Sequence, residues 1–276
     1  MINIVVPIYF DATYNGGMDL KRAVTGLFPS IEKYIDNDFI CRVFIITPQR
    51  SIDALRVNLV NFSFYKKIKI FSDEEVIEGH NFDFQSYLDA PPWFRQQILK
   101  IAISKFIGAE LALYCDSDVL VIKPINQDVF ASGIPYEGMG YKNFNKWFYA
   151  SMDTLYRNQD PYDSFRELID MQPMGVTPEF LVPEVLRGLI NHLSIENENW
   201  IQYLINKING FDNSWNEYSL YWIYYCNNFK STYKYFPSRL YIFINNLAEI
   251  NNKTGQELFM VMQSATLQLN DHSNYF

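Results

Sequence analysis

Apolar residues in the first half of the chain fall in short continuous runs that alternate with segments of helical periodicity. Four such runs occupy residues 2–9, 39–47, 66–71 and 110–115. Continuous apolar runs of this length are typical of strands buried on both faces of a parallel sheet. Segments with helical spacing lie between them, at residues 19–35 and 92–108, and the second has Pro in its first turn and Gly at its end. This alternation predicts an α/β fold with a mostly parallel central sheet flanked by helices.

The pattern changes after Pro124, where segments rich in Tyr, Trp and Asn replace the compact apolar runs. Helical spacing recurs at residues 182–195, 199–208 and 214–226, and a late strand is expected at 230–236. The chain shows no internal repeat and no low-complexity linker. We therefore predict two halves in one continuous body. Residues 1–124 form the first half, and residues 125–276 form a helical, aromatic-rich second half packed on it.

Composition narrows the class of protein. Hydrophobic residues make up 49% of the 276 residues and aromatic residues 17%, so the chain is globular rather than disordered. The net charge of -8 argues against nucleic acid as a partner, because phosphate binding requires clustered Lys and Arg. The three cysteines lie far apart, which fits a reducing compartment. No apolar run is long enough to span a bilayer and the first residues lack a basic segment, so we expect a cytoplasmic protein.

Two aspartates, Asp116 and Asp118, lie at the end of the apolar run ELALYC. In open α/β sheets, ligands bind beyond the carboxyl ends of the strands. Two carboxylates this close repel each other unless a cation lies between them, and Mg²⁺ or Mn²⁺ prefers such oxygen ligands. The same spacing occurs at Asp36 and Asp38, but there it falls in a polar turn where aspartates are simply solvated. Because only Asp116 and Asp118 lie at the end of a predicted strand, we predict a metal and diphosphate site at residues 116–118 and none at residues 36–38.

The segment WFRQQILK followed by ELALYCDSDVLVIKP resembles the GT-A class of nucleotide-sugar glycosyltransferases with a DxD motif, in particular bacterial enzymes associated with surface polysaccharides. The resemblance is strongest over residues 92–124. It implies a GT-A, Rossmann-like fold, a nucleotide-sugar donor, preferably a UDP-sugar, and Mn²⁺ or Mg²⁺ as cofactor. The expected acceptor is a glycan or a lipid-linked glycan.

The resemblance also implies roles for the residues that match the motif. Asp118 corresponds to the direct metal ligand, and Asp116 to the carboxylate shared between the metal and the ribose or sugar of the donor. Asp116 therefore counts among the catalytic and donor-binding residues as well. His272, near the end of the chain, resembles the late histidine that completes the metal site in some GT-A families.

Five further residues are expected to bind the donor. Lys100 precedes Asp116 at a spacing similar to that of a donor-binding lysine in glycogenin-like transferases, where a Lys adds positive charge at the diphosphate. The alternative is that Lys100 is simply a solvated residue of its helix. Arg95 either joins it there or forms a surface salt bridge. Pro7 and Tyr9 lie at the end of the first strand, where GT-A proteins receive the nucleotide base, and Thr47 ends the second strand.

Glu217 is the candidate catalytic base. Inverting GT-A enzymes commonly place their base on a helix well beyond the DxD motif, and Glu217 lies at the start of the aromatic helix SWNEYSLYWIYYC. An acid in the first turn of a helix is also favoured by the helix dipole alone. Asp212 is the alternative base. If the enzyme retains configuration, no protein base is needed, although the HxxGxxKPW motif of the retaining glycogenin-like families is absent.

Other features admit two interpretations each. Trp93, Trp147, Trp215 and Trp222 either stack on sugar rings or belong to the core. The segment 227–243 holds Lys230, Lys234 and Arg239 among aromatics and no acid, so it forms either a strand pair with solvated lysines or a peripheral contact with anionic lipid at the inner face of the membrane. The principal alternative to an enzyme is a catalytically inactive module that binds a glycan or nucleotide.

Overall fold

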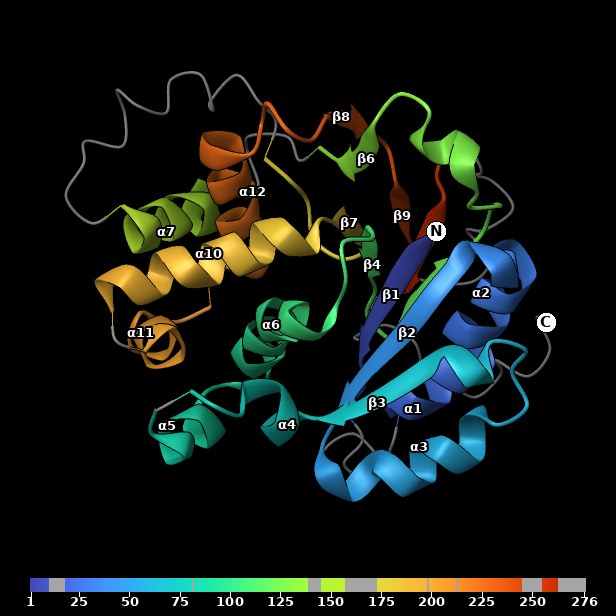
Figure 1. Cartoon of the computed structure of the whole chain (residues 1–276), viewed down its shortest axis with the longest axis horizontal. Helices are drawn as coiled ribbons and strands as arrows, with labels where there is room; N and C mark the ends of the chain where they lie inside the picture. Colours follow the sequence, from blue (N-terminus) through green and yellow to red (C-terminus); the bar gives the residue numbers. More distant parts are fainter. Residues whose placement is uncertain are drawn as a thin grey trace.

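A five-stranded sheet joins four strands of the N-terminal half with one strand of the C-terminal half in this computed structural model (Figure 1). The structure describes residues 1–9, 18–80, 82–138, 145–156, 173–197, 199–211, 213–244 and 255–262. The strands are β1 (Ile2–Pro7), β2 (Ile40–Thr47), β3 (Ile68–Ser72), β4 (Ala112–Tyr114) and β7 (Glu179–Leu181). Their order is β3-β2-β1-β4-β7, and only β7 is antiparallel to its neighbour. The prediction of a mostly parallel central sheet is confirmed.

Both faces of this sheet are buried, which explains the continuous apolar runs. Successive side chains of a strand point to opposite faces. Ile4 and Val6 of β1 accordingly pack into one hydrophobic cluster, and Val5 packs into another. The first cluster lies against helices α2 (Phe28–Tyr34) and α3 (Ile52–Leu59), and the second against α6 (Pro92–Ala102).

The helix expected at 19–35 is present, but its middle is wider than an α-helix. It consists of α1 (Met18–Arg22), a π-helical turn (Ala23–Leu27) and α2. The helix expected at 92–108 is also present, with α6 followed by a 3₁₀ turn over Ile103–Phe106. Two short helices that the sequence did not predict, α4 (Asp73–Ile77) and α5 (Phe84–Asp89), lie between β3 and α6.

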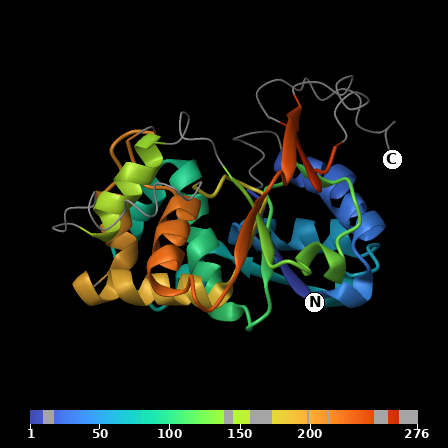
Figure 2. The ribbon, with the colours of Figure 1, turned by 90° about the horizontal axis from the view of Figure 1, so that it is seen from above.

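Helices of the second half gather beside α6, on the side of the sheet away from α2 and α3 (Figures 1 and 2). They are α7 (Asn145–Leu155), α10 (Pro183–Glu196), α11 (Trp200–Asn206) and α12 (Glu217–Asn228). The last three confirm the helices expected at 182–195, 199–208 and 214–226. Trp215 and Trp222 are fully buried among them, so these two tryptophans belong to the core.

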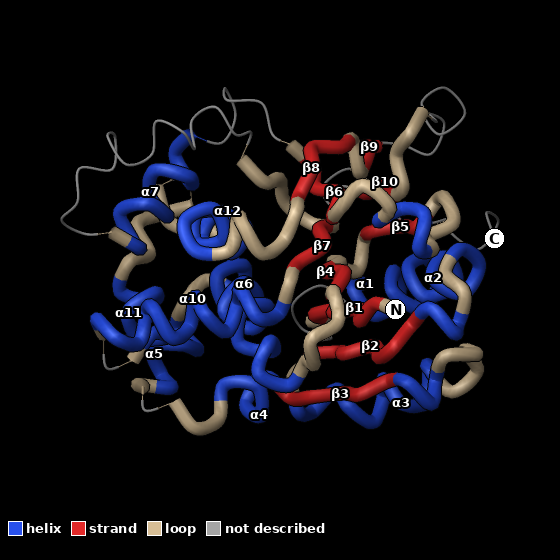
Figure 3. The backbone as a smooth tube through the Cα atoms, turned by 45° about the horizontal axis from the view of Figure 1, so that its top comes forward, coloured by secondary structure: helices blue, strands red, loops and turns tan. Residues whose placement is uncertain are grey.

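Two small sheets complete the fold (Figure 3). One has the order β5-β10-β9, from β5 (Val119–Val121), β10 (Phe259–Met262) and β9 (Tyr241–Ile244). The other pairs β6 (Ile134–Glu137) with β8 (Tyr235–Ser238) in parallel. The strand expected at 230–236 was therefore placed too early, because the chain turns until Tyr233 and pairs only from Tyr235. In the described part of the chain, no helix combines the length and the apolar character that crossing a membrane requires.

Candidate active site

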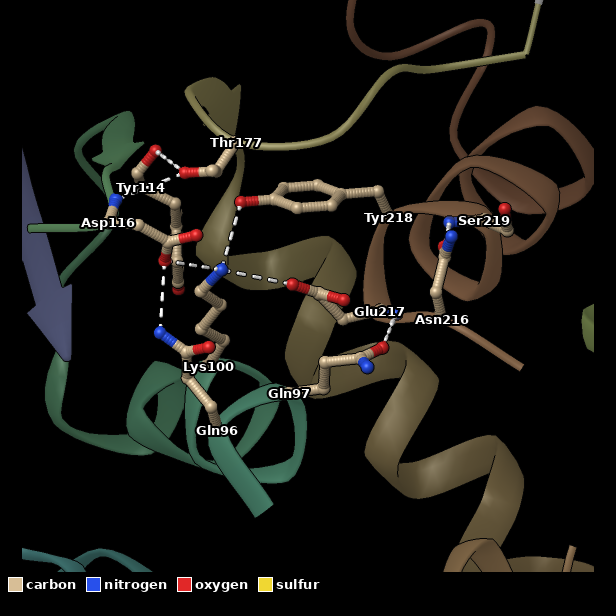
Figure 4. A network of polar contacts seen from close by, with 10 residues as sticks. All are labelled: Gln96, Gln97, Lys100, Tyr114, Asp116, Thr177, Asn216, Glu217, Tyr218 and Ser219. Carbon is tan, nitrogen blue, oxygen red and sulfur yellow. Dashed lines mark hydrogen bonds and ion pairs between the residues drawn. The ribbon is translucent and has the colours of Figure 1, made fainter. Parts of the chain in front are cut away.

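Asp116 lies directly beyond β4, at the carboxyl end of the sheet. Its Oδ1 accepts hydrogen bonds from Lys100 Nζ at 2.9 Å and from Gln96 Nε2 at 3.1 Å (Figure 4). Its backbone N–H donates to Thr177 Oγ1 at 3.1 Å. By contrast, Asp36 and Asp38 are exposed near a turn, as the sequence indicated. The two DxD patterns of the chain therefore differ in burial and in partners.

Lys100 joins two acids that are far apart in sequence. Its Nζ lies 2.9 Å from Asp116 Oδ1 and 3.1 Å from Glu217 Oε1, and it approaches Tyr218 OH at 3.5 Å (Figure 4). The side chain is only 3% exposed, which excludes the interpretation as a solvated helix residue. Burial alone would lower the pKa of Lys100, but Asp116, Tyr218 and Glu217 outweigh that effect and hold the pKa well above its usual value. The amine is therefore a fixed positive charge.

Glu217 is the first residue of α12, and its position is set by hydrogen bonds from both helices. The Glu217 backbone N–H donates to Gln97 Oε1 of α6 at 2.9 Å. Asn216 caps α12, with its Oδ1 accepting from Ser219 N at 2.6 Å. Burial raises the pKa of Glu217, and the Lys100 ammonium opposes that shift. The carboxylate is thus a stronger base than an exposed glutamate. Its side chain is only 5% exposed, so little of it is accessible from solvent.

Asp118 carries an unsatisfied carboxylate oxygen. Its Oδ1 is buried and has no hydrogen-bond partner in the structure. Burial raises the pKa of Asp118 to about 7, the nearby Asp116 adds to the rise, and Arg22 opposes it. Buried polar atoms are rarely left unpaired, so this oxygen is suited to a ligand that the protein itself does not supply. A divalent cation beside Asp116 and Asp118 would fill that role.

A pocket of about 640 Å³, including its open mouth, lies next to these acids. Four of the residues predicted to bind the donor line it: Pro7, Tyr9, Thr47 and Arg95. The Arg95 guanidinium lies 5.5 Å from the centre of the Tyr9 ring and donates to its hydroxyl at 3.4 Å. Gln96 also lines the pocket, and its hydrogen bond to Asp116 connects the pocket to the acids.

Several polar atoms in this pocket are buried and have no hydrogen-bond partner. They are Thr47 Oγ1, Asp73 Oδ1, Tyr87 OH and Arg95 Nε. Burial raises the pKa of Asp73 to about 7, and the neighbouring Glu74 adds to the rise. A pocket with several unpartnered polar atoms is typical of a ligand site.

Sequence reasoning missed Asp73, Tyr87, Gln96 and Thr177. One signal was available: Gln96 precedes Lys100 by one helical turn, so the two side chains share a face of α6. Thr177 lies in a loop and Asp73 begins the short helix α4, and neither position gave such a pattern.

The remaining acidic and basic residues that the sequence singled out are not among the described residues that line the pocket beside Asp116. His272 and Asp212 lie outside the described residues. Lys230, Lys234 and Arg239 are exposed, as both interpretations of the segment 227–243 require. Arg239 pairs with Glu257 at 2.9 Å, so an acid from another segment neutralises part of this basic stretch.

Comparison with known proteins identifies the family and supports the fold. The model of a family of unknown function, DUF6492, matches residues 1–239. No curated protein matches the chain significantly. Among solved structures, the galactosyltransferase LgtC in complex with donor and acceptor sugar analogs has a TM-score of 0.50 at 9% identity, covering 99% of this chain and 92% of that chain. An active-site mutant of LgtC has a TM-score of 0.50 at 11% identity, covering 95% of this chain and 87% of that chain.

Mouse xyloside xylosyltransferase 1 in its apo form gives a TM-score of 0.48 at 11% identity, covering 96% of this chain and 99% of that chain. The two LgtC structures confirm a GT-A-type fold, and at this identity they show the fold alone.

Proposed function

The chain belongs to this family of unknown function, and we propose that it is a metal-dependent glycosyltransferase. In this proposal it moves a sugar from a nucleotide-diphosphate sugar, preferably a UDP-sugar, to a hydroxyl of a glycan or lipid-linked acceptor. The observation that carries the proposal is the position of Asp116 and Asp118 at the carboxyl end of the sheet, joined through Gln96 to a pocket with unpartnered polar atoms. Ligands of open α/β sheets bind at this edge.

The pocket suits the nucleotide part of the donor. Tyr9 offers an aromatic face for the base. Thr47 Oγ1 and Arg95 Nε offer unpartnered polar atoms for base or ribose. LgtC, which shares the fold, was solved with donor and acceptor sugar analogs, and this supports the same class of ligands here. Arg95 also brings a positive charge to the pocket, which favours the diphosphate.

Asp118 and Asp116 would hold Mg²⁺ or Mn²⁺. The fit is favourable because Asp118 Oδ1 has no partner and the Asp116 side chain is 26% exposed. In the described part of the chain, no group of three or more His, Cys, Asp or Glu gathers as a metal site. Two carboxylates are sufficient for ions that keep several waters and bind substrate phosphates. When bound, such an ion acts as a Lewis acid toward the departing diphosphate.

Transfer with inversion requires a base for the acceptor hydroxyl, and we assign that role to Glu217. The hydroxyl oxygen forms a bond to the anomeric carbon, its proton passes to the Glu217 carboxylate, and the electron pair of the broken bond leaves with the diphosphate. Burial raises the pKa of Glu217, which favours proton acceptance, while Lys100 keeps the carboxylate ionised beforehand. Lys100 also holds Asp116 in place.

A retaining transfer is the alternative, and the small exposure of Glu217 favours it. A carboxylate that is 5% exposed and paired with Lys100 is well placed to orient that lysine but poorly placed to meet an acceptor. Glu217 would then be a positioning residue. The anomeric configuration of the product, read by NMR, separates the two mechanisms.

The proposal is tested by incubating the full chain with a panel of nucleotide sugars, with Mn²⁺ or with EDTA, and measuring released nucleoside diphosphate. We expect slow hydrolysis of at least one donor that requires the metal and is lost in Asp118→Asn. Glu217→Gln should keep nucleotide binding and lose transfer. If nucleotide or glycan binds without turnover of any donor, the chain is a binding module and not an enzyme.

A further inference from the structure

Three aromatic side chains from separate parts of the chain pack together, and one of them, Trp93, lines the donor pocket. Trp93 is the second residue of α6, Trp147 lies on α7, and Phe211 follows α11. Their ring centres are 5.5 Å apart for Trp93 and Trp147, 4.5 Å for Trp93 and Phe211, and 5.3 Å for Trp147 and Phe211. We call these three residues the aromatic platform.

The aromatic platform is accessible and its geometry is fixed. Phe211 is 53% exposed, and Trp93 and Trp147 are partly exposed. Trp147 Nε1 donates to the backbone carbonyl of Phe211 at 2.8 Å, which holds α7 and the segment after α11 together. Trp93 also packs against the main hydrophobic cluster, which holds its ring in place. Accessible, preorganised aromatic rings are typical of binding sites.

The platform connects the two parts of the candidate active site. On one side, Trp93 lines the donor pocket together with Arg95 and Gln96, and Gln96 contacts Asp116. On the other side, Phe211 belongs to the segment that leads into α12 and Glu217. The platform therefore borders the pocket assigned to the donor and belongs in part to the segment that leads to the assigned base.

The segment that carries Phe211 is internally braced. Ser214 Oγ donates to the carbonyl of Gly210 at 2.6 Å and accepts from Asn209 N at 2.7 Å. Trp215 then anchors the segment in the core, packing on Phe94 at 5.5 Å. The described residues on either side of Phe211 are therefore held in place by these contacts.

We propose that the aromatic platform is the acceptor subsite and that it binds a pyranose ring of the acceptor glycan. A pyranose has one apolar face of C–H groups and a rim of hydroxyls. The three rings are inclined to one another by 33° to 77°, so they form an angled aromatic surface that buries the apolar face of a sugar and leaves its hydroxyls in water or free to react. This inference rests on the proposed function, because it names the acceptor class of that same site.

The platform itself consists of apolar rings, which suit the uncharged face of a sugar better than an anionic headgroup. Lys207, at the end of α11, pairs with Asp153 of α7 at 2.9 Å, so the cation there is already neutralised. The basic residues Lys230 and Lys234 lie in a different segment, next to β8. A lipid-linked acceptor would therefore place its sugar, and not its phosphate, on the platform.

The test is saturation-transfer NMR on the full chain with methyl pyranosides of glucose, galactose, mannose, N-acetylglucosamine and rhamnose. We expect transfer to the ring C–H protons of at least one pyranoside with the wild type. Phe211→Ala and Trp147→Ala should weaken that binding about tenfold or more, as expected when one stacking ring is removed. Phe243→Ala, which removes another exposed aromatic ring on β9, is the matched control and should bind as the wild type does.

Two results would overturn the inference: no pyranoside in the panel receives transfer, or Phe211→Ala binds it as tightly as Phe243→Ala. Circular dichroism and melting temperature establish that Phe211→Ala is folded, which the 53% exposure of this side chain favours. The hydrolysis of nucleotide sugars without acceptor reports on the proposed function separately. Hydrolysis by the wild type together with unchanged sugar binding in Phe211→Ala would reject the platform and leave the transferase proposal standing.

Discussion

Lys100 is a buried cation between two carboxylates that are separated by a large part of the sequence. Asp116 Oδ1 and Glu217 Oε1 both lie within 3.1 Å of its Nζ. Removing one partner of a buried ion pair leaves the other charge without compensation, which costs far more than the pair itself contributes. The stability of the protein and the geometry of the candidate site therefore depend on the same side chain.

Replacement of Lys100 by Met should lower the free energy of unfolding by about 3 kcal/mol at neutral pH. Without the ammonium, Glu217 remains as a buried carboxylate with no cation beside it, close to the partly exposed Asp116. The loss should be smaller at pH 5, because burial raises the pKa of Glu217 and protonation there removes its charge. Urea denaturation at both pH values measures it. Lys69→Met, at an exposed position of β3, is the control and should change little; an equally small effect for Lys100→Met would contradict the importance of the ion pair.

The buried carboxyl of Asp73 allows a second test, which concerns how the stability of the protein depends on pH. Its pKa of about 7 in the folded protein exceeds the usual value of 3.8, chiefly through burial. The unfolded chain thus releases this proton more readily, and stability is lost as the pH rises from about 4 through 7. Arg95 limits the loss, and Glu74 increases it.

We therefore expect Asp73→Asn to be more stable than the wild type at pH 8, by about 1 to 2 kcal/mol after allowance for partial solvent exposure. At pH 5 the advantage should shrink. Melting temperatures at the two pH values measure the difference, with Asp53→Asn, a substitution on the exposed face of α3, as the reference. A pH-independent difference between Asp73→Asn and the wild type would show that the carboxyl titrates normally.

At the scale of elements, α6 and α12 position the site. Gln96, Gln97 and Lys100 all project from α6 toward the acids, and Glu217 begins α12 (Figure 4). Asn216 fixes the start of α12 through its hydrogen bond to Ser219 N. The first turn of α12 therefore carries both a structural cap and the proposed base.

Asn216→Ala should destabilise the protein by about 1 kcal/mol, the usual cost of losing an N-cap. Asn199→Ala removes the corresponding cap of α11, where Asn199 Oδ1 accepts from Ile201 N and Gln202 N. We expect similar losses in urea denaturation for both variants. Only Asn216→Ala should reduce metal-dependent donor turnover as well, because it displaces Glu217. Equal turnover in the two variants would argue against a role for the start of α12.

Local sequence patterns predicted most of the helices and strands of the main sheet and the α6 region, but they did not predict contacts between residues far apart in the sequence. The strand runs of β1 and β2 and the periodicity of α6 and α10 needed only neighbouring residues to be read. The contact of Lys100 with Glu217 depends on how α12 docks against α6, and no local pattern records that docking. The same reason explains why β8 was placed too early: its start is fixed by pairing with β6.

At the scale of the whole molecule, the second half of the chain returns to the first. β10 pairs with β5, directly after the DxD motif, and Met262 N donates to the Asp118 carbonyl at 3.0 Å. The division at residue 124 between a donor-binding half and an acceptor-binding half stays a prediction. Candidate donor residues come from the first half, and Glu217, Trp147 and Phe211 come from the second.

The central claim is that Asp116 and Asp118 hold a divalent cation that binds the diphosphate of a nucleotide sugar. A crystal of the protein soaked with Mn²⁺ and UDP, with anomalous data collected at the manganese edge, tests it most directly. We predict the strongest anomalous peak between the Asp118 and Asp116 carboxylates and the UDP diphosphate, and its loss in Asp118→Asn. UDP in the pocket with no manganese peak at these two aspartates would contradict the claim.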